Sequence, residues 1–352
     1  MVTMSTQPLS APLPRYGLLH TGGTFGCVGV PLAPLDAEHF LPLLMQHLPH
    51  LHQADWHVWA MPTLIDSSQL TPNDWAPLLT QLLTCYAQGV RQIVVIHGTD
   101  TLAYTAAFLA EALAGSDLCV VVTGSQLPFL NAQATQLADP SDAIDNLRTA
   151  CGVLLRDQAG VYVAFNGEYW PAQTVQKIHS RDLSAFTGHS RAGYPASGYR
   201  TLSAQSRQRW IDDALTHLPR WQDALQQQHV SVYYATPQTP VQLARQLQHL
   251  LDQPPCGLIL LGYGLGNFPD HPLIRQALTH AQQAGVLVIL STQVPYGGTE
   301  ARYASGDWLG TVGVLPSATL TPAAIYARLT WLGMLHTDRN TRRRRWLACL
   351  KA

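Results

Sequence analysis

The sequence predicts a two-domain α/β protein, in which a larger N-terminal domain with a mainly parallel, doubly wound sheet precedes a smaller C-terminal α/β domain. The first observation is length: 352 residues, 47% of them apolar, suffice for two domains with buried cores. The second observation is that short apolar runs, rich in β-branched residues, alternate with longer helical stretches. Such βαβα order favours parallel strands joined by right-handed crossovers.

In the N-terminal domain, predicted to span residues 1–195, the strands are short apolar runs. Residues 92–96 are typical, because their β-branched side chains suit a strand that is covered on both faces. The clearest helix start is at Thr71, which can cap a helix, while Pro72 suits its first position and Asp74 complements its dipole. The predicted strands are residues 16–20, 56–61, 92–96, 118–123 and 161–165, and two further helices span 102–114 and 141–155.

A second βα series follows a predicted linker at residues 196–228, where Gly, Ser, Pro and Arg are frequent before a short polar helix. The C-terminal domain, residues 229–352, is predicted to hold strands at 230–234, 258–261 and 286–290, with helices at 241–251, 272–284 and 322–335. Four consecutive arginines, residues 342–345, are interpreted as a solvated helix end, with a nucleic-acid-binding tail as the alternative.

The overall composition indicates neither a nucleic-acid nor a membrane partner. The formal net charge is −1, the pI is about 6.9, and the longest apolar runs are far shorter than a bilayer span. The N-terminus has neither the basic nor the apolar region of a signal peptide. Six scattered cysteines without a CxxC pair favour a reduced, cytoplasmic protein, in which Cys27 is interpreted as a packing residue rather than a catalytic one. The histidines lack metal-ligand spacing, so no metal is expected.

Three Thr/Gly-rich turns come directly after predicted strands: residues 21–24 (TGGT), 97–101 (HGTDT) and 123–126 (TGSQ). Because the carboxyl ends of parallel strands share one edge of a sheet, these turns should converge on one pocket. Glycines let backbone N–H groups approach a ligand closely, and helix N-termini favour negative charge. Such a pocket suits a small anionic ligand and a developing oxyanion.

Each turn alone has a simpler explanation. Gly22 and Gly23 fit an ordinary tight turn and lack the spacing of nucleotide-binding loops. Thr99 and Asp100 could simply cap the next helix, and His97 is more simply a hydrogen-bonded core residue than a base. Only the combination of the three turns favours a functional site.

Lysine usage adds a further indication, since the chain has two lysines, Lys177 and Lys351, against nineteen arginines. Lysine can act as a base when its pKa is lowered, whereas arginine stays charged. If Lys177 reaches the predicted pocket, a Thr–Asp–Lys relay becomes possible, with the lysine activating a threonine hydroxyl.

The two motifs at residues 21–24 and 97–101, about 75 residues apart, resemble the signature motifs of the bacterial-type L-asparaginases. The similarity extends from Tyr16 to about Leu335. It includes four further stretches, residues 65–75 and 103–106, which resemble the cytoplasmic type I branch, and residues 123–128 and 262–267.

This resemblance implies an amidohydrolase that needs no cofactor and converts L-asparagine, with L-glutamine second, into the acid and ammonia. It implies Thr24 as the nucleophile, and Thr99, Asp100 and Lys177 as a second group that polarises a hydroxyl or water. It also implies substrate contacts from Gly23, Asp66, Ser67, Ser68, Gly98 and Ser125.

Family members form homodimers or dimers of dimers in which the neighbour's C-terminal domain completes each site, so Asn267 and Glu300 are weaker candidates for that part. The chain departs from the family in residues 25–35 (FGCVGVPLAPL), which lack the usual tyrosine. Either another tyrosine such as Tyr303 replaces it, or the activity is weak or redirected. The alternatives are a non-catalytic amino-acid-binding protein, a glutaminase-asparaginase and an amidotransferase component that acts on aminoacylated tRNA.

Overall fold

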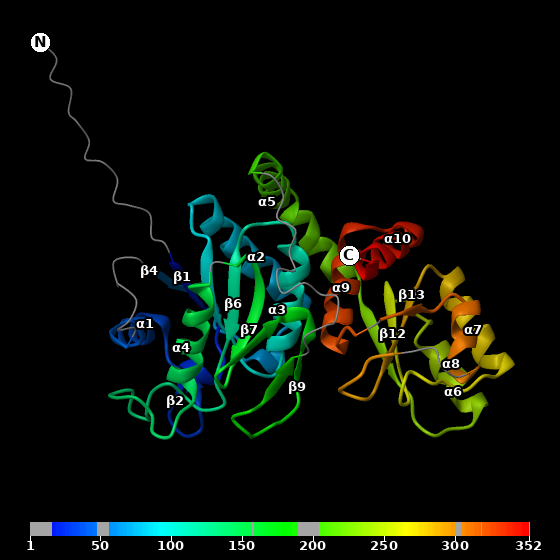
Figure 1. Ribbon diagram of the computed structural model, residues 1–352, viewed down its shortest axis with the longest axis horizontal. Coiled ribbons are helices and arrows are strands. Elements are labelled where there is room, and N and C mark those ends of the chain that lie inside the picture. The colour runs from blue at the N-terminus through cyan, green and yellow to red at the C-terminus, as the bar shows by residue number, and fades with distance from the viewer. Residues whose placement is uncertain are drawn as a thin grey trace, which may run out of the picture.

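The computed structural model describes residues 16–47, 56–156, 158–188, 204–299, 304–317 and 319–351. A six-stranded sheet of order β4-β1-β5-β6-β7-β8 forms the centre of the N-terminal domain (Figure 1). Five of these strands are parallel and the edge strand β8 is antiparallel. Their bounds are β1 Tyr16–His20, β4 Trp56–Ala60, β5 Gln92–Ile96, β6 Cys119–Thr123, β7 Gly160–Phe165 and β8 Glu168–Pro171.

Helices cover both faces of this sheet, which confirms the doubly wound prediction. Along β5, Ile93 and Val95 belong to the core formed with α2 (Pro72–Ala87) and α3 (Leu102–Ala112). Val94 and Ile96 belong to the core on the other face, formed with α1 (Ala37–Gln46) and α4 (Ala143–Leu154). All four side chains are fully buried, as a continuous β-branched run requires.

The N-terminal domain also contains elements that the sequence did not predict. These include α1, the edge strand β8, and two antiparallel pairs: β2 (Cys27–Val28) with β3 (Ala33–Pro34), and the hairpin of β9 (Val175–Lys177) and β10 (Phe186–Gly188). Strands β9 and β10 have only three residues each, too few to establish a two-residue periodicity. The hairpin matters because its first strand ends at Lys177.

A four-stranded parallel sheet of order β11-β12-β13-β14 forms the C-terminal domain, with the three predicted strands and one further strand, β14. Its strands are β11 Val230–Tyr234, β12 Gly257–Gly262, β13 Leu287–Thr292 and β14 Leu315–Pro316. One face packs against α6 (Pro240–His249), α7 (Pro272–Gln283) and α8 (Ala304–Thr311), and the other against α9 (Pro322–Leu335) and α10 (Arg339–Lys351). Helix α9 contacts both α3 and β12, and it lies between the two sheets (Figure 1).

The predicted linker contains α5 (Ala204–Gln227), a helix of 24 residues rather than the expected short one. It packs against α2 and α9, and it buries Ala214, Leu218 and Leu225 there. The prediction of a short helix is therefore wrong, because partners on two other helices cover its sparse apolar side. The domain bounds drawn around this linker stay a prediction.

The arginine run is only partly solvated. Arg343, Arg344 and Arg345 are exposed on α10, but Arg342 is buried and donates to the carbonyl of Gly285 at 2.7 Å. Burial of its neighbour Trp346 places this side of α10 against the protein. The interpretation of the whole run as a solvated helix end is therefore wrong for Arg342, which ties α10 to the segment before β13.

A buried ion pair joins α3 to α9. Arg328 donates from Nε and Nη2 to one oxygen of Glu111 at 2.9 and 2.7 Å. The two side chains are only 3% and 11% exposed. Such a pair fixes the geometry between two elements, because either charge alone would be costly to bury.

Glu111→Gln is expected to lower the free energy of unfolding by about 3–5 kcal/mol, since it leaves the Arg328 charge buried without its counterion. Urea denaturation would measure the loss. The matched control is Asp145→Asn, which breaks an exposed pair with Arg148 and should cost under about 1 kcal/mol. Equal, small losses in the two variants would contradict a structural role for the buried pair.

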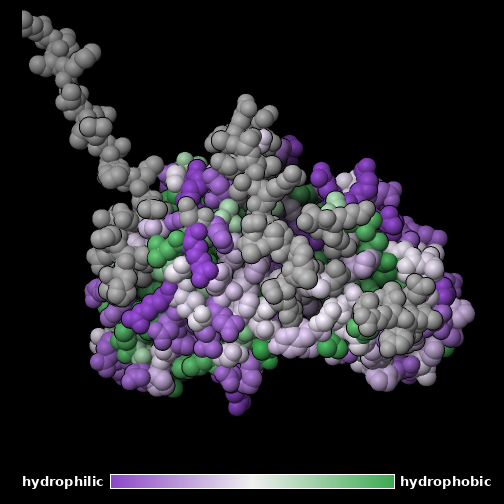
Figure 2. Space-filling view, viewed as in Figure 1, coloured by the Kyte–Doolittle hydropathy of each residue, from purple (hydrophilic) through white to green (hydrophobic). Residues whose placement is uncertain are grey.

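None of the helices in the described parts of the chain is long and apolar enough to cross a membrane. On the face shown in Figure 2, hydrophilic and hydrophobic residues are interspersed over both domains.

Candidate active site

The candidate site lies where β1 and β5 end side by side. Strand β1 lies between β4 and β5. The next strand of this sheet along the chain, β4, lies on one side of β1, and the later strands lie on the other side, so the strand order reverses between β1 and β5. Crevices at such switch points are the usual ligand sites of open parallel sheets. Thr21 fixes the start of the first motif, because its N–H and its hydroxyl both donate to the carbonyl of Ile96, at 2.9 and 3.0 Å.

The two motifs are in backbone contact at their glycines. Gly23 has a φ of +85°, in the left-handed region, and a Cβ at this position would lie 2.3 Å from Gly98 Cα. A Cβ at Gly98 would lie 2.4 Å from the hydroxyl oxygen of Ser67. Three segments far apart in the sequence therefore meet with no room for a methyl group between them. The third predicted turn joins them, because a Cβ at Gly124 would lie 2.2 Å from the carbonyl oxygen of His97.

Gly23→Ala is expected to lower the free energy of unfolding by about 2–5 kcal/mol, since it adds both left-handed strain and a clash with backbone. The matched control is Gly152→Ala in α4, where an added Cβ meets nothing within 4 Å. That change should stabilise the protein by about 0.5–1 kcal/mol through helix propensity. Thermal or urea unfolding of both variants tests the pair, and a neutral Gly23→Ala would show that the two motifs can separate.

Thr24 stands at the start of a short 3-10 turn, Thr24–Gly26, that follows Gly23. The side chain is half-buried, and among the described residues its hydroxyl has no hydrogen-bond partner. Cys27, at the end of the turn, donates from Sγ to the carbonyl of Gly23 at 3.3 Å. Burial, with the nearby Asp66 charge, raises the pKa of Cys27, which disfavours the reactive thiolate. This turn therefore offers a Thr24 hydroxyl that no described residue engages, whereas the Cys27 thiol is both engaged and disfavoured as a thiolate.

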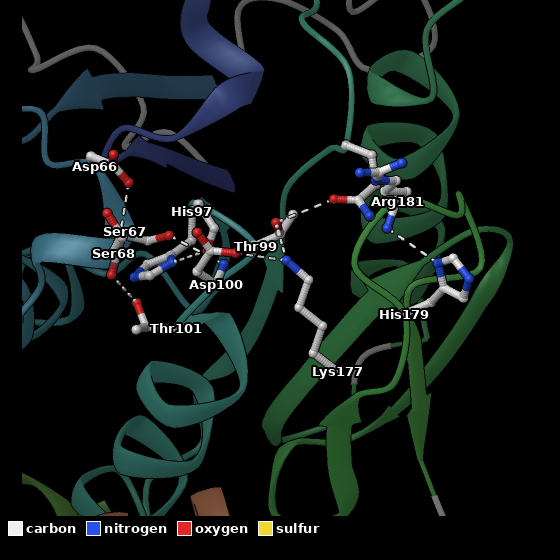
Figure 3. Close-up of polar contacts among 12 residues, drawn as sticks. Asp66, Ser67, Ser68, His97, Thr99, Asp100, Thr101, Lys177, His179 and Arg181 are labelled. Atoms are coloured by element: carbon white, nitrogen blue, oxygen red, sulfur yellow. Dashed lines mark hydrogen bonds and ion pairs between the residues drawn. The ribbon is translucent and has the colours of Figure 1, made fainter.

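Lys177 reaches the second motif from β9 (Figure 3). Its Nζ donates to the Thr99 hydroxyl at 2.9 Å and to Oδ1 of Asp100 at 2.8 Å. Thr99 is 7% exposed, the Lys177 side chain is 21% exposed, and the Asp100 carboxylate, at 59%, is open to solvent. A threonine, an aspartate and a lysine thus form one cluster, the arrangement that the rarity of lysine suggested.

The predicted substrate-binding segment lies on the other side of Asp100 (Figure 3). Ser67 is 3% exposed, and its hydroxyl accepts the N–H of Asp100 at 3.2 Å while its carbonyl accepts from Thr101 at 2.8 Å. Asp66 caps the same turn by accepting the N–H of Ser68 at 3.0 Å. Asp66 and Ser68 are exposed, so their outer atoms remain accessible to a ligand.

The third turn, residues 123–126, is stabilised by hydrogen bonds with two residues that were not predicted as site residues. The Asp142 carboxylate, before α4, accepts the N–H groups of Gln126 and Leu127 at 3.0 and 2.9 Å. Asn146 donates to the carbonyl of Gly124 at 3.0 Å. Ser125 is 1% exposed, and its hydroxyl donates to the carbonyl of Leu127. The Ser125 hydroxyl is thus engaged within its own turn.

Two buried histidines flank the site. His97 donates from Nδ1 to the carbonyl of Gly98 at 2.8 Å, and burial lowers its pKa to about 4, which confirms a core histidine. His20, at the end of β1, is 1% exposed, and burial lowers its pKa to about 4 as well. Its ring packs against Phe40 and beneath Gly26, and among the described residues neither ring nitrogen has a partner. Both rings are therefore neutral at physiological pH.

A cavity of about 190 Å³ opens beside these groups, lined by Thr21, Met61, Ile65, Ser67, Leu78 and His97 among others. Asn267 follows β12 in the C-terminal domain, where its carbonyl accepts the N–H of Tyr263 at 2.9 Å. Glu300 and Tyr303 lie outside the described residues. Within the described part of the chain, no group of three or more His, Cys, Asp or Glu residues could hold a metal ion.

Comparison with known families matches residues 16–202 to "Asparaginase, N-terminal" and residues 229–346 to "Glutaminase/Asparaginase C-terminal domain". The chain belongs to the asparaginase family. Both halves of the fold and the order of the motifs agree with that assignment.

Individual asparaginase-family proteins align over most of the chain. It is 27% identical to the protein called L-asparaginase 1 of Escherichia coli K12 over 332 residues, 92% of this chain and 93% of that protein. It is 28% identical to a glutamyl-tRNA(Gln) amidotransferase component of Pyrococcus furiosus, covering 93% of this chain and 73% of that one. The solved structure of the thermostable L-asparaginase from Thermococcus kodakarensis superposes with a TM-score of 0.71 at 25% identity, covering 94% of this chain and 96% of that chain.

Proposed function

We propose that this asparaginase-family protein is a cytoplasmic L-asparaginase that hydrolyses the side-chain amide of L-asparagine to L-aspartate and ammonia. The observation that carries the proposal is the Thr99–Asp100–Lys177 cluster, whose motif contacts the turn that presents Thr24, a hydroxyl that no described residue engages. Nucleophilic amide hydrolysis needs these parts: a free hydroxyl, a group that moves protons and donors for the oxyanion. The name of the Escherichia coli relative, L-asparaginase 1, supports the same activity.

In the proposed mechanism the Thr24 hydroxyl oxygen attacks the amide carbon of the substrate. Backbone N–H groups of the two glycine turns, around Gly23 and Gly98, stabilise the oxyanion that forms. The proton lost by the Thr24 hydroxyl passes to the amide nitrogen, so ammonia leaves as the carbonyl re-forms and an acyl ester remains on Thr24. Water, oriented by the Thr99 hydroxyl that Lys177 holds in place, then attacks this ester. The proton that the water loses passes to the Thr24 oxygen, which restores the hydroxyl as aspartate is released.

Substrate recognition is proposed to rest on the segment opposite Lys177. The exposed carboxylates of Asp66 and Asp100 suit the α-ammonium group, while Ser67 and Ser68 supply hydroxyl and backbone donors for the α-carboxylate. L-glutamine differs by one methylene, which a pocket discriminates by only about 1–3 kcal/mol. We therefore propose L-glutamine as the second substrate.

We also propose that the protein works as a homodimer or a dimer of dimers, with Asn267 and Glu300 contributed to a neighbour's site. The proposal follows the family resemblance. Asn267 supports it by its place, since it lies in a turn at the carboxyl end of β12, the kind of edge where ligand sites form.

A second candidate function is an amino-acid-binding protein without turnover. It is favoured by one observation, the absence of a tyrosine in residues 25–35, where the family carries one. The experiment that separates the two is ammonia release from L-asparagine and L-glutamine by the purified chain, beside calorimetric titration with L-aspartate. Ammonia release supports the hydrolase. Binding of L-aspartate without release supports the binding protein, and neither binding nor release would refute both.

A further inference from the structure

The side chain of Gln126 links the second motif to the hairpin that carries Lys177. Its Oε1 is 3.4 Å from the Thr99 hydroxyl, and its Nε2 is 3.1 Å from the carbonyl oxygen of Asp182. Asp182 lies in the hairpin loop between β9 and β10, five residues beyond Lys177. Gln126 therefore contacts the hairpin loop through its amide nitrogen and Thr99 through its amide oxygen.

The hairpin loop determines which way the Gln126 amide points. A backbone carbonyl can only accept a hydrogen bond, so the atom of Gln126 that faces Asp182 must be the NH₂ group. The carbonyl oxygen of the amide is then the atom that faces Thr99. An amide oxygen can only accept, so the hydroxyl of Thr99 must be the donor in this contact.

The contact with Lys177 leads to the same direction for the Thr99 proton. A lysine ammonium has three donors and no acceptor, so Lys177 donates to Thr99 Oγ1 and Asp100 Oδ1. With Lys177 as donor, the single hydroxyl proton of Thr99 points to Gln126. One lone pair of the Thr99 oxygen is left over, and it serves as an acceptor for a ligand or water in the site.

The backbone of Gln126 is held firmly enough for this role. Its N–H donates to the Asp142 carboxylate at 3.0 Å, and Asp142 is 7% exposed. Asn146 donates to the same carboxylate at 2.9 Å and to the carbonyl of Gly124 at 3.0 Å. Two polar residues at the start of α4 therefore fix the turn from which the Gln126 side chain extends.

We propose that Gln126 is a positioning residue, which turns the Thr99 hydroxyl so that it accepts a hydrogen bond from the attacking water and which tethers the hairpin loop beside Lys177. The first part of this inference, the orientation of the Thr99 hydroxyl, rests on the proposed hydrolase function. The bond between Thr99 and Gln126 is long for a hydroxyl donor, so it directs the proton more than it stabilises the fold. The tether to Asp182 is independent of turnover.

The test uses three variants of the full chain. Gln126→Met removes both side-chain hydrogen bonds and keeps the length of the side chain. Gln126→Glu keeps an acceptor for Thr99 but, when ionised, has no donor for the Asp182 carbonyl. Gln133→Met is the matched control, an exposed glutamine in the same long loop. The measurements are kcat and KM for L-asparagine, and hydrogen exchange of the hairpin-loop amides 178–184.

Gln126→Met should lower kcat about five- to tenfold, the effect of one lost hydrogen bond, with KM within about twofold. Gln126→Glu should keep kcat within about threefold at neutral pH, because Thr99 still has its acceptor. Both should speed exchange in the loop, and Gln133→Met should change nothing. Equal kcat losses in the two Gln126 variants, or none in Gln126→Met, would overturn the role in orienting Thr99.

Unchanged exchange in both Gln126 variants would overturn the tether. Wild-type protein that releases no ammonia would instead refute the proposed function, and the exchange data would then still decide whether Gln126 holds the hairpin loop.

Discussion

Thr24→Ala is expected to lower the rate of ammonia release from L-asparagine by roughly 10⁴–10⁶-fold, because only binding and the oxyanion donors remain once a nucleophile is removed. The expectation follows from the turn around Thr24, in which no other described side chain can replace it. Cys27 is engaged with the Gly23 carbonyl, and its raised pKa keeps it a thiol. The neighbouring Thr21 uses its hydroxyl on Ile96.

The loss of turnover should come without a loss of stability. Among the described residues the Thr24 hydroxyl has no partner, so its removal leaves no buried group unsatisfied, and unfolding should shift by less than about 1 kcal/mol. Steady-state ammonia assays and urea unfolding on the same preparation measure both quantities. Thr24→Ser is the informative control, since it restores a hydroxyl and should recover most of the activity. Substantial turnover by Thr24→Ala would show that the nucleophile lies elsewhere.

The parts of the site that the sequence predicted are those fixed by strand ends. Residues 21–24 and 97–101 each follow a strand that is evident from an apolar run, and parallel strands bring such ends to one edge. The contact between Gly23 and Gly98 follows from that rule, because adjacent strands β1 and β5 end at the same level.

The position of Lys177 in the site was harder to predict from the sequence. The hydrogen bonds that stabilise the third turn could not be predicted at all. Lysine scarcity drew attention to Lys177, but its hairpin has three-residue strands that carry no periodic signal. Asp142 and Asn146 act through backbone groups 15 to 22 residues away. A side chain can form a hydrogen bond with the backbone of any residue type. The sequence therefore contains no complementary pair of residues that would reveal such a bond.

The length of α5 was mispredicted because it depends on distant partners. Because α5 has few apolar residues, its sequence indicates only a polar segment. The length of the helix depends on the other helices that pack against it. Ala214, Leu218 and Leu225 are buried only because α2 and α9 lie alongside. Tertiary packing, rather than local propensity, therefore decided the length of this helix.

Lys177→Met is expected to lower kcat by about 10²–10³-fold, the usual effect of removing one positioned donor from an active site. The methionine keeps the length of the side chain but provides neither a charge nor a proton for Thr99. The stability cost should be under about 1 kcal/mol, since the Asp100 carboxylate is 59% exposed and water can replace its partner. A kcat near the wild-type value would show that the lysine only pairs with Asp100.

Lys177→Arg then distinguishes the two ways in which the lysine could act. An arginine keeps the positive charge near Thr99 and Asp100 but cannot lose its proton at any pH used for assay. If Lys177 acts as a fixed charge, the arginine variant should recover much of the activity that methionine loses. If Lys177 takes and returns a proton, arginine should be about as inactive as methionine. We expect the first result, because Lys177 donates to both Thr99 and Asp100 while Gln126 accepts the hydroxyl proton of Thr99.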